Sequence, residues 1–523
     1  MAPPASHSSS SRETEVLQDE KVDEAYIQGR EEEISNQQTH PAPNHDVEKA
    51  LHGTSVSTHS DDPTLDVGSV VNVQEEEPRD PNIRKKWGLL ACLSSVTLVT
   101  PLASSFFAPG VPQVLETFNE TSNLIAGLIV SIYILGFAIG PLIIAPMSEL
   151  YGRFLLYNIC NLLFVVFTVC CAVSNSMGML IAFRLLAGCA GAAPVTLGGG
   201  SIADIFPREK RAGAMAIWSM GPLLGPVLGP VAGGFLIQAK GWRWVFYILI
   251  ILGDVFSILL FFVGSETYPP TLLARRAARL RKETGNPHLH SALAKNMPPR
   301  EVFLLSIVRP MKMLLLSPIV LLTSTYIAVN YGILYLFFTT ITFVFKETYR
   351  FSTSLIGLAY LGMGVGMVLG VASLGLLSDK VIRKQQRKGD DDVRPEHRLA
   401  LHLTVPGAVL MPIGVFIYGW TTDRHVRWIV PIIASTFGIV TGMTTIQTYL
   451  IDAFTLHAAS ALAAITVLRS VFGAFLPLAG LDLFDALGLG WGNSLLAFVG
   501  LAMVPVPVAF SRYGEGIRTR WTA

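Results

Sequence analysis

The stretch Gly221–Gly234 reads GPLLGPVLGPVAGG, and it decides how the rest of the chain is interpreted. Its first four glycines are spaced four residues apart, and a proline follows each of the first three. In water such a segment would hardly be helical, because interior proline costs about 3 kcal/mol and interior glycine about 1 kcal/mol. In a bilayer one segment satisfies its own backbone only as a helix, and neighbouring helices can cover the carbonyls that proline frees. The pattern therefore predicts a transmembrane helix whose bare glycine stripe packs closely against a partner.

The composition is that of a membrane protein. Of the 523 residues, 51% are hydrophobic and 15% are charged, and the mean hydropathy is +0.49. These values lie outside the usual range of soluble globular proteins. All five cysteines fall within apolar runs, which argues against a disulfide framework or a zinc site.

The near-neutral net charge of +1 hides two unlike regions. Residues 1–80 hold eighteen acidic and five basic residues, a net charge of −13, so the remainder carries +14. Residues 1–83 contain no sustained apolar run and no signal-peptide pattern. We expect them to form a disordered acidic tail, and the first apolar span to act as its own insertion signal.

Apolar stretches of about 20 residues, the length that crosses a bilayer, recur twelve times along the chain. A basic segment of polar character divides them into two groups of six. We therefore expect an all-α membrane protein with twelve transmembrane helices. The expected spans are 88–110, 123–146, 154–175, 178–205, 212–237 and 244–264, followed by 317–345, 354–378, 399–420, 428–451, 459–483 and 491–511.

The distribution of lysine and arginine predicts the orientation. If the N-terminal tail is cytoplasmic, the inner segments after it carry 26 basic residues and the outer loops carry six. The positive-inside rule then places both termini in the cytoplasm. The predicted organisation is a disordered acidic cytoplasmic tail (1–83), a six-helix bundle (84–264), a cytoplasmic central loop (265–316), a second six-helix bundle (317–511) and a cytoplasmic C-terminus (512–523).

The second half of the chain echoes the first. Ser148–Arg153 follows the second span and Ser378–Arg383 follows the eighth, and both place an acid after serine and an arginine four residues later. Asp204 and Asp452 likewise stand at the inner ends of the fourth and tenth spans. Two correspondences at equivalent positions indicate a duplicated six-helix unit. Parallel repeats of this kind form the pseudo-symmetric major facilitator fold, whose substrate site lies at mid-membrane between the halves.

The glycine stripe resembles the antiporter motif in the fifth helix of proton-coupled exporters of the major facilitator superfamily. The finer resemblance is to the twelve-span drug:proton antiporters of fungi, and it covers residues 87–511 through fragments such as Gly241-Trp242-Arg243-Trp244 and Glu266-Thr267-Tyr268. In this fold the fifth and eighth spans face each other, and we expect the stripe to meet the glycines of the eighth span, Gly362, Gly366 and Gly370. The residues that match the antiporter motif are Gly225, Pro226, Gly229, Pro230, Gly233 and Gly234.

Charged residues at the inner ends of the spans resemble the superfamily's inner-loop signature. Charge-assisted bonds among them would hold the cytoplasmic side closed in one state and break in the other. The alternative is positive-inside topology with incidental ion pairs. The predicted cytoplasmic gate comprises Glu149, Arg153 and Asp204, with the mirror cluster Asp379, Arg383 and Asp452.

Two charged residues lie within spans of the first half. Arg184 should face the bundle interior because charge is costly in lipid, and it resembles the proton-coupling arginine of the family's fourth helix. Its family role implies a fixed positive charge that lowers the pKa of a nearby acid. Asp254, halfway along the sixth span, is the candidate for the titrating group; the alternative is a structural aspartate bonded to hydroxyl groups. Arg469 is the analogous charge in the eleventh span.

The resemblance implies that substrate contacts the inward faces of the first, fourth, seventh and tenth spans. Aromatic side chains with a polar tip suit a large, partly apolar ligand that forms hydrogen bonds. For each residue alone, an ordinary core role is the alternative. The candidates are Asn330, Tyr331, Tyr335, Gln447 and Tyr449.

Together these features predict a secondary exporter that exchanges protons for a drug-like molecule or a secondary metabolite. The alternatives are a proton symporter for a nutrient, organic acid or polyamine, and a membrane sensor that signals through its tail. Enzyme motifs and a nucleotide-binding glycine loop are absent from the sequence, so we expect no enzyme, no metal, no cofactor and no nucleic-acid partner, and a proton gradient as energy source. We expect a monomer in the plasma membrane, with the vacuolar membrane as alternative. Asn119 begins a glycosylation sequon in a short outer loop.

Overall fold

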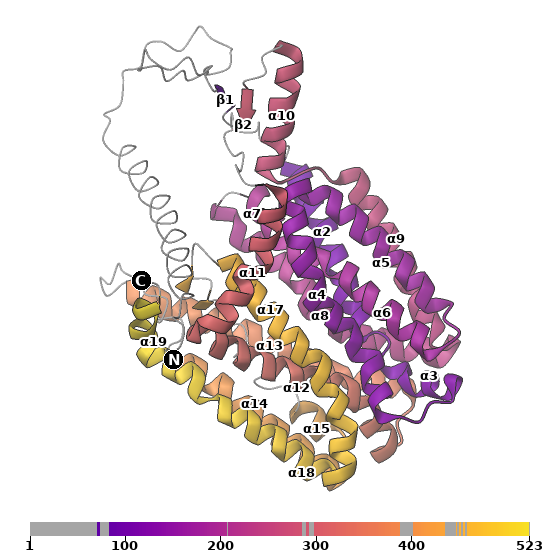
Figure 1. Ribbon diagram of the computed structural model, residues 1–523. Helices are drawn as coiled ribbons and strands as arrows, with labels where there is room; N and C mark the ends of the chain where they lie inside the picture. Colours follow the sequence, from indigo (N-terminus) through magenta and orange to yellow (C-terminus); the bar gives the residue numbers. More distant parts are fainter. Residues whose placement is uncertain are drawn as a thin grey trace, which may run out of the picture. The chain divides into compact units, whose positions relative to one another are not determined.

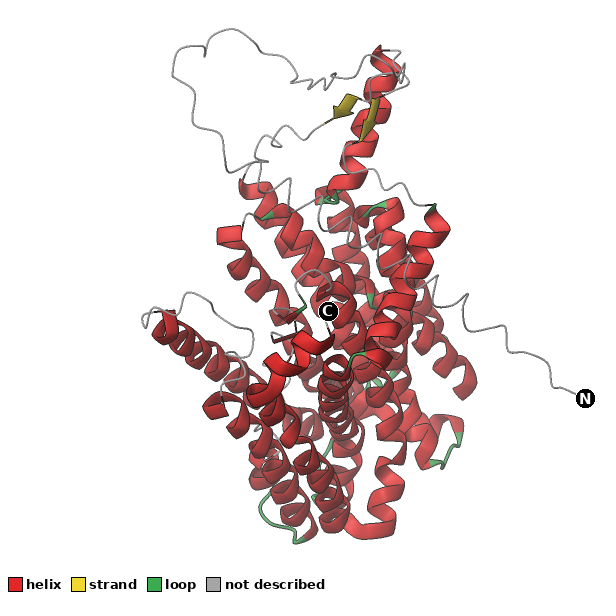
Figure 2. Cartoon of the chain, turned by 60° about the vertical axis from the view of Figure 1, so that its left-hand side comes forward, coloured by secondary structure: helices red, strands yellow, loops and turns green. Residues whose placement is uncertain are grey.

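The computed structural model describes residues 71–73, 83–206, 208–284, 289–291, 298–386, 401–434, 446, 449–450, 453–454 and 458–521. These residues are almost entirely helical, as Figure 2 shows. Each of the twelve expected spans contains at least one helix, although the tenth is described only in part. The expected all-α membrane fold is confirmed.

Several spans are built from two consecutive helices. In the fourth span, α6 gives way to α7 at Ala192, and in the twelfth, α18 gives way to α19 at Val504. A non-helical Gly488 also interrupts α18 between the eleventh and twelfth spans. The helices of the first half are α2 (Ile83–Ser105), α3 (Val111–Phe118), α4 (Asn123–Tyr151), α5 (Arg153–Ala172), α6 (Met177–Gly191), α7 (Ala193–Ile205), α8 (Arg208–Lys240) and α9 (Arg243–Val263). Those of the second are α12 (Pro318–Thr348), α13 (Thr353–Gln386), α14 (Leu401–Asp423), α15 (Ile429–Ala434), α17 (Ala458–Phe475), α18 (Gly480–Met503) and α19 (Pro505–Trp521).

Length and hydropathy alone identify eight segments of the described residues that could cross a membrane. Six of them coincide with the six expected spans of the first half, and Pro318–Thr348 coincides with the seventh. The eighth segment, Ser460–Gly514, covers both the eleventh and the twelfth. The described part of the eighth span adds the shorter apolar stretch Thr353–Leu369.

Equivalent helices make equivalent contacts in the two halves (Figure 1). Helix α2 packs along α8 as α12 packs along α17, and α5 packs along α9 as α14 packs along α18. The halves meet through α8 with α13 and through α4 with α17, which are again equivalent pairs. This correspondence confirms the duplicated unit that the sequence indicated.

The glycine stripe of α8 packs against α2. A Cβ atom added to Gly225 would lie 2.8 Å from the backbone nitrogen of Leu102, and one added to Gly229 would lie 3.0 Å from the carbonyl oxygen of the same residue. Distances below about 3 Å are closer than real Cβ contacts allow. The backbones of α8 and α2 therefore approach so closely that only glycine fits between them.

The same contact satisfies the backbone that proline disrupts. Pro230 has no N–H group, so the carbonyl of Pro226 receives no helical hydrogen bond. The Ser105 hydroxyl of α2 donates to that oxygen at 2.8 Å. This confirms that a neighbouring helix covers a freed carbonyl, which allows α8 to run unbroken through three prolines.

The fifth and eighth spans do pack together as expected, but the four spaced glycines of the stripe face the first span rather than Gly362, Gly366 and Gly370. Helix α8 does pack against α13 of the second half, but through Gly234, whose added Cβ would lie 3.0 Å from the Cα of Gly357. Gly364 approaches Val227 on the same side, whereas Gly362 approaches Ile432 of α15. A four-residue glycine spacing shows which face of a helix is bare but not which neighbour covers it.

The central segment contains regular structure. Helices α10 (Pro269–Thr284) and α11 (Pro299–Leu316) occupy most of the expected loop, and α11 packs against α4, α12 and α17. The strand β2 (Leu289–Ser291) pairs in parallel with β1 (Val71–Val73) beside α10 (Figure 1). The tail that we expected to be disordered thus contributes one short strand, and its other residues up to 82 lie outside the described residues.

Close packing of α8 on α2 gives the first prediction. Gly225→Ala should destabilise the protein by about 1–3 kcal/mol, because the methyl group has no room against the α2 backbone. The measurement is the melting temperature of the detergent-solubilised full chain. Gly213→Ala, in the same helix with no atom within 4 Å of the added Cβ, is the matched control and should melt at or above the wild-type temperature. Equal melting of the two variants would contradict the packing described.

Candidate functional site

Two intramembrane arginines lie at the ends of a continuous series of contacts. The Nη2 atom of Arg184 in α6 donates to the Ser104 carbonyl of α2 at 3.3 Å. The Ser104 hydroxyl lies 3.2 Å from the hydroxyl of Tyr335 in α12, and so joins the two halves. The Tyr335 and Tyr331 rings are 4.9 Å apart, and the Arg469 guanidinium of α17 lies 5.2 Å from the Tyr331 ring. We call these five residues the central cluster.

Aromatic side chains surround the Arg184 guanidinium. It lies 5.0 Å from the Phe107 ring and 5.6 Å from the Tyr133 ring, distances at which the faces of aromatic rings attract cations. Arg184 is only 2% exposed, so it faces the bundle interior, as a charge in a membrane span should. Among the described contacts of Arg184 there is no carboxyl group. The acid whose pKa Arg184 was expected to lower is therefore not among its described neighbours.

The structure brings together only some of the candidate substrate residues. Tyr331 and Tyr335 belong to the central cluster, whereas the buried Asn330 side chain donates to the Tyr326 carbonyl of its own helix at 2.7 Å. Tyr449 is fully buried, with its ring 6.4 Å from that of Phe510 in α19. Gln447 lies outside the described residues. Ser104, which sequence reasoning missed, connects Tyr335 to Arg184, and nothing in the sequence marks it.

Asp254 occupies a different kind of position. It is exposed near the middle of α9, and Ile251, Val255 and Ile258 on the same helix are each more than half exposed. The structure therefore places this carboxyl group on the outer surface of its half rather than beside Arg184. Periodicity could not reveal this, because almost every residue around it in α9 is apolar.

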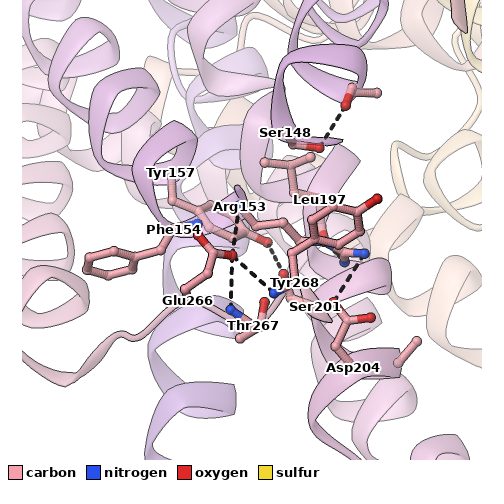
Figure 3. Close-up of polar contacts among 12 residues, drawn as sticks. Ser148, Arg153, Phe154, Tyr157, Leu197, Ser201, Asp204, Glu266, Thr267 and Tyr268 are labelled. Carbon is pink, nitrogen blue, oxygen red and sulfur yellow. Dashed lines mark hydrogen bonds and ion pairs between the residues drawn. The ribbon is translucent and has the colours of Figure 1, made fainter. Parts of the chain in front are cut away.

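The inner ends of the first-half helices meet in a second cluster, formed by Arg153, Asp204, Glu266 and Tyr268 (Figure 3). An ion pair of 3.2 Å joins the Arg153 guanidinium to the Asp204 carboxylate, and the Tyr268 ring lies 5.3 Å from the same guanidinium. We call this the Arg153 cluster. Its described contacts join helices of the first half to the segment between α9 and α10, and none of them reaches the second half. The predicted gate connects the halves only in its closed state, so its role stays a prediction.

Glu266 holds the Arg153 cluster in place and was not among the predicted site residues. Its carboxylate accepts hydrogen bonds from the backbone nitrogens of Arg153 at 2.9 Å and Phe154 at 3.3 Å, the first residues of α5. It also accepts from the nitrogens of Thr267 and Tyr268, each at 3.0 Å, where α10 is about to begin. An anion at a helix N-terminus satisfies unpaired N–H groups and interacts favourably with the helix dipole.

The glycine before α5 makes room for this carboxylate. Gly152 has a φ angle of +95°, which a side chain rarely adopts, and its added Cβ would collide with the Glu266 carboxyl group. The glycine of this inner loop is thus required by both backbone geometry and space. Glu149 is exposed in the last turn of α4. Asp379 and Arg383 lie on α13, and Asp452 lies outside the described residues.

At the opposite end of the helices, side chains do join the two halves. The Asn123 amide of α4 donates to Asp482 at 3.0 Å and to Asp485 at 2.7 Å, both in α18. Gln238 of α8 accepts from the Ser354 backbone nitrogen of α13 at 2.9 Å. These bonds hold the halves together at the end predicted to face outward. Asn119 is exposed at the same end, where it terminates α3 with a φ angle of 55°.

Within the described residues, no group of three or more histidine, cysteine or acidic side chains could hold a metal ion. The described cysteines are free thiols.

The Glu266 contacts give the second prediction. Glu266→Ala should lower stability by roughly 2 kcal/mol or more, because four backbone N–H groups lose their acceptor. Glu266→Gln should lose less, because three of the four bonds reach a single oxygen that an amide can supply. Melting of the solubilised full chain is the measurement. Glu283→Ala, which removes an exposed pair with Arg279, is the control and should leave melting unchanged. Identical effects at both glutamates would refute the capping role.

Comparisons of the sequence and of the structure with known proteins both identify membrane transporters. The family model described as the Major Facilitator Superfamily matches residues 93–477. The chain is 49% identical to the MFS-type transporter penM of Penicillium rubens, over 85% of this chain and 91% of the relative. It is 46% identical to the efflux pump radE of Floropilus chiversii, over 90% of this chain and 92% of the relative.

Solved structures share the fold at low sequence identity. A partially occluded, inward-open conformation of the xylose transporter XylE from E. coli aligns with a TM-score of 0.57 and 16% identity, over 82% of this chain and 98% of that one. A bacterial homologue of the human lysosomal transporter Spinster, in an inward-facing conformation, aligns with a TM-score of 0.56 and 16% identity, over 84% of this chain and 98% of that one.

Proposed function

This chain belongs to the major facilitator superfamily of membrane transporters, and on that premise we propose that it is a proton-coupled exporter of a drug-like molecule or secondary metabolite. Proteins of this superfamily carry small organic substrates and are transporters rather than enzymes. The efflux direction is supported by the antiporter-like stripe of α8 and by the relative named an efflux pump.

The observation that carries the proposal is the contact between halves at the central cluster. Ser104 of the first half and Tyr335 of the second touch within the membrane-spanning helices, where two bundles that rock against each other would enclose a ligand. Alternating access requires that contacts at one end form while those at the other break. The Asn123 and Gln238 bonds join the halves at one end, while the described contacts of the Arg153 cluster at the other end do not reach the second half.

Several finer features belong to the same proposal. We propose both termini in the cytoplasm, the plasma membrane as location, a monomer as the working unit, and 84–264 and 317–511 as the two bundles. Arg184 is the proposed proton-coupling residue, and the Arg153 cluster is proposed to act as a gate through the rigidity it gives to the first half. Asp254 is exposed on the outer surface of the first half, which argues against its role as the proton carrier, and the experiment below tests that role.

The third prediction concerns efflux from cells that express this protein. Expression in drug-sensitive yeast should confer resistance to some members of a panel of toxic compounds, with lower retention of a radiolabelled compound chosen from that panel. A protonophore should abolish the difference, because the energy source is a proton gradient. Arg184→Ala should abolish efflux while the protein stays in the membrane, and Arg279→Ala, on the exposed face of α10, should export normally.

Two outcomes would favour the alternatives, and two more would contradict the residue assignments. Higher retention in expressing cells would identify an uptake symporter. If neither the full chain nor a chain without residues 1–70 transports the compound, and drug resistance is lost when these residues are removed, the chain is a sensor. Normal efflux by Arg184→Ala would refute the coupling role, and an unchanged response to the protonophore in Asp254→Asn would exclude Asp254 as the proton carrier.

A further inference from the structure

The central cluster contains two positive charges and, in the described residues, no negative one. Arg184 is almost completely buried, and Arg469 is half-buried at the other end of the cluster. The Nε atom of each guanidinium is buried without a hydrogen-bond acceptor. Leaving a buried donor of a charged group unsatisfied is costly, so both arginines are suited to an acceptor that is not part of the described structure.

The sequence shows that no other acid of the spans is available to them. Within the twelve expected spans the only acidic residues are Asp204, Asp254 and Asp482. Asp204 pairs with Arg153, and Asp482 accepts from Asn123 at the opposite end of the helices. Asp254 is exposed on α9. Each of these acids is thus engaged elsewhere or faces outward, and in the part of the chain that the structure describes neither arginine has an acidic partner.

Aromatic side chains lie between the two arginines. The Tyr331 and Tyr335 rings lie 4.9 Å apart, and Ser104 continues the series to Arg184. A guanidinium donates two parallel hydrogen bonds to a carboxylate or a similar delocalised oxyanion. An ammonium or other cation in the same place would be repelled by two charges in a low-dielectric environment.

We propose that the transported molecule is an organic anion, whose carboxylate or similar delocalised oxyanion binds Arg184 or Arg469 and whose apolar body packs on the aromatic side chains of Tyr331 and Tyr335. This inference rests on the proposed transport function and narrows its substrate class. Arg469 is the residue that discriminates charge at the half-buried end of the cluster, and Arg184 does so at the deeply buried end.

A pair of dyes with one ring system and opposite charge tests the inference. Fluorescein is anionic and rhodamine 123 is cationic, and both share a xanthene body. Fluorescence anisotropy with the purified full chain in detergent should show that fluorescein binds more tightly. Arg469→Gln should weaken fluorescein binding at least about tenfold, and Arg469→Lys should restore much of the loss, because it keeps the charge. Fluorescein that binds no more tightly than rhodamine 123 to the wild type overturns the inference.

The matched control is Arg243→Gln. Arg243 also stacks on an aromatic ring, that of Trp242 at 4.4 Å, and donates to a carbonyl, that of Ser174 at 3.1 Å, but it stands at the outer end of α9. Its substitution should leave fluorescein affinity unchanged. An equal loss in Arg243→Gln and Arg469→Gln would overturn the assignment. Because Arg184 is deeply buried, the wild-type charge preference and Arg469→Gln, at the half-buried end of the cluster, carry the test.

Flux measurements separate this inference from the proposed function. Proteoliposomes that move rhodamine 123 but not fluorescein along a proton gradient would support transport and overturn the anion assignment. Proteoliposomes that bind fluorescein through Arg469 but move neither dye would support the charge assignment and contradict the transport function.

Discussion

The requirement that polar groups be satisfied without water governs this structure. In hydrocarbon an unpaired backbone carbonyl costs several kcal/mol, yet α8 contains three prolines that each remove a helical hydrogen bond. The Ser105 hydroxyl of α2 accordingly bonds to the Pro226 carbonyl, and glycines let the two backbones come close enough for that bond. The glycine surface of α8 and the Pro226 carbonyl, which lacks a helical hydrogen bond, are thus both accommodated by the same contact with α2. A helix exposed to water would not be stable with this many glycines and prolines.

Charged side chains also have to be satisfied without water, and they find different partners. Asp204 lies at the inner end of its span and pairs with Arg153, and the Glu266 carboxylate accepts four backbone hydrogen bonds nearby. Asp482 accepts from Asn123 across the halves. The two arginines of the central cluster instead rest on aromatic rings and carbonyl oxygen. These three acids at the ends of helices are thus bonded within the protein, while Arg184 and Arg469 of the central cluster each keep a buried Nε donor without an acceptor.

The sequence predicted the class of fold, the duplicated unit and the interior position of Arg184, because hydropathy and the cost of charge in lipid depend on composition and spacing alone. It did not predict that the glycine stripe meets α2, since four-residue spacing leaves the neighbour open. Glu266 and Ser104 were missed because their roles arise from helices distant in sequence. The outward position of Asp254 was hidden by a span that is apolar all round.

Helix α8 presents bare backbone to two neighbours at once, α2 on one side and α13 on the other. Few long side chains separate α8 from α2 and α13 at these contacts, so side-chain rearrangement can absorb little of a tilt of α13. We expect α2 to move with it. Helix α2 carries Ser104, whose hydroxyl touches Tyr335 and whose carbonyl receives Arg184. The Arg184 guanidinium and the second half are therefore linked through closely packed main chain, and we expect the geometry of the central cluster to change with the angle between the two bundles.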